Sequence, residues 1–191
     1  MKVRRIFILA AALLLAGGSA IFADGVSQKI NVYFNKQLSD EQGLFIDGKT
    51  YVSVRSVSDK LKALVSWDDN AKELNVFNPN VNMMAVTEKG AFGEVPKGKN
   101  AVTFDLIAKV DNLYTDITAL KLTIANPFGE ETEIISQQTK DLNLPDPDHF
   151  WYRVRNISYT FESSGKYTIR FWMQPADGPM QVAAESVIYS K

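Results

Sequence analysis

His149 is the only histidine in the chain, and it lies in the stretch Asp146-Pro147-Asp148-His149. An aspartate beside a histidine can orient the imidazole as a general base. Nucleophilic catalysis would also need a serine on a strained turn, and the sequence contains no Gly-x-Ser-x-Gly motif. We therefore expect His149 to have a structural role in a loop, and we predict no catalytic residue.

Three aspartates near this histidine, Asp141, Asp146 and Asp148, could supply oxygen ligands to calcium, which binds loop carboxylates. Their spacing is not that of an EF-hand, and aspartate is also a common turn former. The chain has no cysteine, which excludes thiolate zinc sites, iron–sulfur clusters and cysteine nucleophiles. The turn-forming interpretation is favoured, so we predict no metal and no cofactor.

Two tryptophans with neighbouring arginines indicate a binding surface. Alternation along two predicted strands places Trp151, Arg153 and Arg155 on the outside of one strand, and Arg170 and Trp172 on the outside of the other. Aromatic faces stack on sugars or partner proteins, and arginine binds carboxylates or phosphates. We predict that Trp151, Arg153, Arg170 and Trp172 form a ligand-binding face on one sheet. Alternatively, the tryptophans cover the sandwich edge or pack against the first domain.

The composition is that of a folded protein with no strong charge. The chain has 191 residues, of which 46% are hydrophobic and 11% aromatic, enough for a packed core in one large or two small domains. The net charge of -1 lacks the positive excess that general nucleic-acid binding requires. We therefore expect no nucleic-acid partner.

Residues 1–23 have the layout of a secretory signal peptide. Basic residues at positions 2, 4 and 5 precede an apolar run over 6–16, and the small residues 17–20 offer a cleavage site. The alternative is an uncleaved membrane anchor, but the apolar run is shorter than the roughly 20 residues that a span needs. No cysteine follows for a lipid anchor. We predict a secreted, cell-wall-associated protein with no stable membrane anchor after cleavage, from a Gram-positive bacterium.

Residues 28–79 are predicted to form a small domain of strands around one short helix. The strands are expected at 30–34, 44–46, 51–52, 65–67 and 74–77. Asp47-Gly48 is a strong hairpin-turn signal between the second and third of these strands.

The helix of this domain is predicted to begin after Ser53, whose hydroxyl can accept a free main-chain N–H. Val54, Val57 and Leu61 follow at i, i+3 and i+7 and define one apolar stripe. The polar residues between them are expected to face water or the domain edge: Arg55, Ser58, Asp59 and Lys62.

The motif Asp47-Gly48-Lys49-Thr50-Tyr51-Val52, followed in register by Arg55, Leu61, Ala63, Val65, Trp67 and Asp68, resembles the copper amine oxidase N-terminal-like domain. This resemblance, over about 50 residues, implies one copy of the stalk module of bacterial envelope proteins, used as a spacer, adhesion or wall-binding element. It does not imply copper or amine oxidation. Ser53, Asp59 and Lys62 depart from the family, which usually has proline, glutamate and glycine there; a lysine in the left-handed geometry of that glycine costs about 1 kcal/mol.

Two residues of the motif have alternative roles. Arg55 could contact a ligand, but we expect it to tie the start of the helix to a carboxylate or carbonyl. Trp67 is predicted to lie in the core rather than to serve as an exposed sugar platform.

Residues 82–191 are predicted to form an immunoglobulin-like β-sandwich. Gly90, Gly93, Pro96 and Gly98 indicate a mobile stretch, which is followed by several short strands at sandwich-like spacing. A break in alternation predicts a bulge near Arg155-Asn156. Residues 163–171 resemble the turn and strand that carry a tyrosine corner, with Tyr167 as the corner residue.

Together these patterns predict an α+β chain: a small β-β-α-β-β stalk-like module followed by an all-β immunoglobulin-like sandwich. The predicted function is a non-enzymatic secreted envelope protein that binds cell-wall polysaccharide or another exported protein. The alternative is a secreted inhibitor or regulator of an extracellular enzyme such as a protease, acting through a loop such as 142–149.

Overall fold

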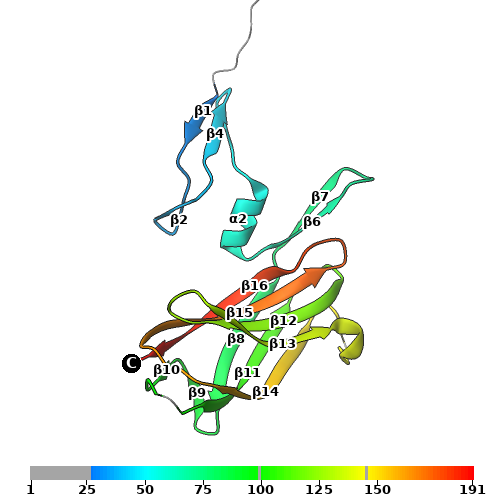
Figure 1. Ribbon diagram of the computed structural model, residues 1–191. Helices are drawn as coiled ribbons and strands as arrows, with labels where there is room; N and C mark the ends of the chain where they lie inside the picture. The colour runs from blue at the N-terminus through cyan, green and yellow to red at the C-terminus, as the bar shows by residue number, and fades with distance from the viewer. Residues whose placement is uncertain (1–26, 99, 145) are drawn as a thin grey trace, which may run out of the picture. The chain divides into compact units, whose positions relative to one another are not determined.

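The computed structural model describes residues 27–98, 100–144 and 146–191 (Figure 1). It consists of two compact units, of which the first ends at Val52 and the second is Ser53–Lys191. The predicted signal peptide, residues 1–23, lies outside the described residues.

The described part of the first unit is a set of short strands. β1 (Gln28–Ile30), β4 (Gly43–Ile46) and β5 (Lys49–Tyr51) form an antiparallel sheet, and β2 (Tyr33–Phe34) pairs with β3 (Gln37–Leu38). Asp47 and Gly48 both have positive φ between β4 and β5, which confirms the predicted hairpin turn. None of the hydrophobic side chains of residues 27–52 is buried.

The second unit contains one α-helix, one short 3-10 helix and eleven strands within its described residues. They are α2 (Val54–Leu61), β6 (Leu64–Asp68), β7 (Glu73–Phe77), β8 (Asn80–Thr87), β9 (Gly90–Phe92), β10 (Glu94–Val95), β11 (Val102–Asp111), β12 (Ile117–Ala125), β13 (Glu131–Gln138), η1 (Thr139–Asp141), β14 (Phe150–Tyr159), β15 (Gly165–Pro175) and β16 (Gln181–Ser190).

Most of the second unit is a β-sandwich. One sheet has the strand order β10-β16-β15-β12-β13 and the other has the order β14-β11-β8-β9 (Figure 1). Alternate side chains of both sheets enter one shared core. Tyr152 of β14 and Phe171 of β15, for example, meet across it with ring centroids 5.8 Å apart. Burying a side chain such as that of Phe171 stabilises the fold by roughly 1.5–3 kcal/mol.

Tyr167 has the geometry expected of a tyrosine corner. Its side chain is buried, and its ring packs edge-on against Phe161 at 4.9 Å between centroids. The Tyr167 hydroxyl accepts a hydrogen bond from the main-chain N–H of Ser163 at 3.0 Å and donates one to the carbonyl of the same residue at 3.1 Å. These bonds confirm the predicted role of Tyr167 in tying strand β15 to the turn before it.

Helix α2 has the predicted ends and an unexpected orientation. The Ser53 hydroxyl caps its start, and Lys62 ends it in the left-handed conformation, with φ at 61°. The apolar stripe is not buried within the described chain, because Val54 and Leu61 remain 40% and 61% exposed. Ser58, expected at the polar face, is instead the buried residue of the helix.

The predicted α+β class was wrong. Strands account for 58% of the described residues and helices for 7%, with a single α-helix of eight residues, so the chain is mostly β. The reason is local. The helical pattern after Ser53 stops at Lys62, and every longer element of the described chain is a strand.

Two further expectations for the sandwich had different outcomes. The bulge is confirmed, since the register between β11 and β14 shifts between Phe104 and Leu106, opposite Asn156. The stretch that contains Gly90 and Gly93 was predicted to be mobile and to precede the strands, but it contains the short strands β9 and β10. The preceding strand, β8, was not predicted.

Candidate functional site

The four predicted binding residues do not share a sheet. Trp151 and Arg153 lie on β14, in the sheet that also contains β11 and β8. Arg170 and Trp172 lie on β15, in the opposite sheet. The prediction of one common face was therefore wrong, because strand alternation shows that a side chain points outward but does not show which sheet the strand joins.

The outer side of the β14-β11-β8 sheet carries an open surface, which we call the Trp151 face. It consists of Trp151, Arg153, Ile107, Lys109, Asn82 and Met84. Lys109 lies directly between Trp151 and Asn82 in the strand register, and Ile107 lies between Arg153 and Met84. Trp151 is 65% exposed and Met84 is 49% exposed, so the face combines an accessible aromatic ring with apolar and polar neighbours.

Lys109 is held beside Trp151 by an acidic neighbour. Its Nζ lies 2.6 Å from Asp111 Oδ2 and 6.0 Å from the centroid of the Trp151 ring. The hydrogen bond from Lys109 lowers the pKa of Asp111, with a smaller contribution from His149, so the carboxylate stays ionised at neutral pH. A positive charge is thereby kept close to the exposed indole.

Arg153, two residues further along β14, is also held by an aspartate. Its Nε and Nη2 both donate to Asp105 Oδ2, at 3.0 and 2.6 Å. The other oxygen, Oδ1, accepts the main-chain N–H of Asn156 at 2.8 Å. The bulge would otherwise leave this N–H without a hydrogen-bond partner. This N–H and the Arg153 guanidinium lower the pKa of Asp105. The bulge and the fixed arginine therefore depend on one carboxylate.

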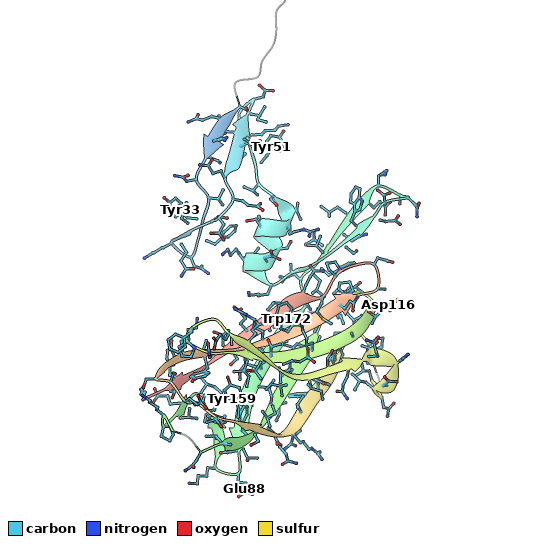
Figure 2. The ribbon with its side chains drawn as sticks, viewed as in Figure 1. Tyr33, Tyr51, Glu88, Asp116, Tyr159 and Trp172 are labelled. Atoms are coloured by element: carbon cyan, nitrogen blue, oxygen red, sulfur yellow. The ribbon has the colours of Figure 1, made fainter. Side chains whose placement is uncertain are left out.

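A hollow of about 610 Å³ adjoins this end of the face. Its lining includes Glu88 of the β8–β9 turn, which Figure 2 labels, together with Asp105, Arg153, Thr103 and Asn156. Hydroxyl, amide, carboxylate and guanidinium groups converge there, which is the mixture of donors and acceptors that holds polyhydroxylated ligands.

Arg170 and Trp172 are already engaged by neighbouring side chains. Arg170 pairs with Glu131 and, at 2.9 Å, with Glu185. The Trp172 indole N–H donates to Thr123 Oγ1 at 2.9 Å. Lys121 Nζ lies 4.5 Å from the centroid of the Trp172 ring, within cation–π range. Trp172 offers a less open aromatic ring than Trp151 does, because Trp172 is only partly exposed and its N–H is bonded, whereas Trp151 is 65% exposed.

The loop before β14 uses its polar residues to form turns. Asp148 Oδ1 accepts the main-chain N–H of Tyr114 at 3.1 Å, and Asp146 Oδ1 accepts that of Asp148 at 2.9 Å. His149 Nδ1 accepts the N–H of Asn112 at 3.4 Å. Within the described residues, no group of three or more histidine or acidic side chains is arranged to hold a metal ion. Tyr114 is a further exposed aromatic side chain beside this loop, with 66% of its surface accessible. No motif in the sequence marked it as a candidate binding residue.

The environments of Trp67 and Arg55 differ from those predicted. Trp67 is 49% exposed on β6, so its predicted place in the core was wrong. The Arg55 side chain makes no ion pair or hydrogen bond with the described residues, in contrast to the predicted tie at the start of the helix.

Among the residues that the structure covers, no helix is long and apolar enough to cross a membrane. Comparison of the chain with protein-family models and with curated proteins finds no match.

Proposed function

We propose that this chain is a non-enzymatic, secreted cell-envelope protein whose Trp151 face binds cell-wall glycan. The observation that carries the proposal is the exposed indole of Trp151, set on strand β14 beside the positioned cations of Lys109 and Arg153. Sugar rings stack on such aromatic faces through their C–H groups, while their hydroxyls need donors and acceptors around the ring.

Preorganisation supports this assignment. Lys109 and Arg153 are each oriented by an aspartate, so a ligand would meet donors already in place and would lose less side-chain entropy on binding. The apolar side chains of Met84 and Ile107 continue the surface beyond Trp151, as expected for a ligand longer than one ring.

The wider architecture is consistent with an exported binding module. The signal-like leader motivates secretion, and the stalk-like motif motivates association with an envelope. In the sandwich, β8, β11 and β14 lie on one sheet and β13, β12, β15 and β16 on the other, the distribution that immunoglobulin-like domains have. Together with the Tyr167 corner, this order supports the proposed immunoglobulin-like fold.

A cell-wall retention assay tests the proposal. Purified residues 24–191 would be incubated with Gram-positive cell walls and washed at moderate salt, beside Trp151→Ala. The matched control is Trp67→Ala, which removes another half-exposed indole far along the chain. We expect Trp151→Ala to lose retention and Trp67→Ala to keep it. Retention of both variants, or of neither variant nor the parent protein, would overturn the proposal.

A further inference from the structure

The outer edge of β6 pairs with an amide group at Val65. Gln181 Oε1 accepts the main-chain N–H of Val65 at 2.9 Å, and Gln181 Nε2 donates to the Val65 carbonyl at 2.8 Å. A side-chain amide thus makes the two hydrogen bonds that an adjacent strand would make at this position.

Beyond Gln181, the same edge is open. Because Val65 directs its main-chain groups away from β7, the alternation of an antiparallel pair directs those of Trp67 to the same side. No hydrogen bond to the Trp67 main chain is formed along that edge by residues the structure describes. A two-stranded ribbon such as β6-β7 is marginally stable in water, and a third strand would stabilise it.

A cleft of about 460 Å³ lies against this edge, inside the second unit. Its apolar lining includes Val65, Trp172, Met180 and Val182. Figure 2 shows Trp172 at the sheet surface near helix α2. A cleft with this lining would accept one apolar side chain of a bound segment.

Arg55 offers to the cleft a cation that is unpaired among the described residues. Lys62, which also lines the cleft, is paired with Glu185 at 3.1 Å, and Asp59 adds one carboxylate to the lining. Arg55 is exposed on the first turn of α2 and has no ion pair with any described residue. A free guanidinium beside an apolar cleft matches a carboxylate next to an aliphatic side chain.

We propose that the β6 edge and this cleft bind an extended peptide segment by strand addition. The peptide main chain pairs with Trp67, an aliphatic side chain enters the cleft against Trp172, and an acidic group pairs with Arg55. This is a protein-partner site on a different surface from the Trp151 face, and it does not depend on glycan binding.

The test is an NMR titration of the ¹⁵N-labelled chain with the acetylated peptide Thr-Leu-Thr-Leu-Asp, which has free carboxylates. We expect shifts of the Trp67 main-chain amide and of the Trp172 indole N–H. A peptide with proline in place of the central threonine lacks a main-chain donor and should not bind. Shifts confined to other residues, none at millimolar peptide, or equal binding of the proline peptide would overturn the proposal.

Two variants of helix α2 test the charge requirement. Arg55→Gln should weaken peptide binding by about tenfold, the loss expected for one charge-assisted hydrogen bond. Lys60→Gln removes the same charge from the same exposed helix without lining the cleft, and should leave the affinity unchanged. Equal weakening in both variants would show a non-specific effect of net charge and would contradict the assignment of Arg55.

Discussion

The side-chain amide of Gln181 forms two hydrogen bonds with the main chain of Val65, 116 residues away in sequence. This contact joins β6 to the first residue of β16. Gly178, in the loop between β15 and β16, lies so close that an added Cβ would stand 3.1 Å from the Val65 carbonyl oxygen. The base of the hairpin is anchored in the sandwich core by Leu64, with Phe77 packed against it, and the Gln181 amide adds a polar attachment one residue further along β6.

Gln181→Ala should loosen the outer edge of β6 at Val65 without unfolding the sandwich. Loss of two hydrogen bonds corresponds to about 1–2 kcal/mol of local stability. We expect the amide of Val65 to exchange with solvent at least tenfold faster, as measured by hydrogen exchange, with the thermal midpoint of the sandwich unchanged. Gln138→Ala, on an exposed position of β13, is the matched control. Unchanged protection of Val65 would contradict this role of Gln181.

Tyr167→Phe should destabilise the sandwich by about 1–2 kcal/mol, because the buried hydroxyl makes two hydrogen bonds to Ser163. Chemical denaturation measures the change as a lower midpoint at a constant slope. Tyr114→Phe removes a hydroxyl from a side chain that is 66% exposed and should change stability by less than about 0.5 kcal/mol. Equal effects of the two substitutions would show that the corner is not stabilising.

Stability should fall in acid partly through Glu185. Burial alone would raise its pKa, but hydrogen bonds from Arg170 and Lys62 outweigh burial, so the pKa lies below the ordinary value of 4.5. A carboxyl whose pKa is lower in the folded state stabilises the fold above its unfolded pKa, and this contribution is lost as pH falls through the folded value.

The variant Glu185→Gln measures that contribution. Below about pH 4.5, its free energy of unfolding should depend less steeply on pH than that of the parent chain. Denaturation curves collected between neutral pH and pH 3 provide the comparison. Identical pH profiles for the two proteins would show that the ion pairs of Glu185 do not favour the folded state.

Local features of the fold were predictable from the sequence. The Ser53 cap, the left-handed Lys62, the Asp47-Gly48 turn and the Tyr167 corner each depend on a few neighbouring residues. The bulge at Asn156 was also visible, because it interrupts an otherwise regular alternation.

Features that depend on distant pairing were not predictable. Trp151 and Trp172 both point outward as alternation requires, but only strand pairing places them on opposite sheets. Trp67 alternates like a core residue, yet its face of the two-stranded β6-β7 ribbon stays half exposed. The strand β8 was missed because its apolar residues, such as Met83 and Met84, do not alternate clearly.

The three tryptophans allow a direct test of the central claim, since Trp151 lies on a different surface from Trp67 and Trp172. The measurement is a titration of the ¹⁵N-labelled chain with a soluble N-acetylhexosamine oligosaccharide that carries no peptide, following the three indole N–H signals by NMR. Glycan binding at the Trp151 face predicts that the Trp151 signal shifts and saturates while those of Trp67 and Trp172 stay in place. A stationary Trp151 signal, whether or not another indole moves, would contradict the account.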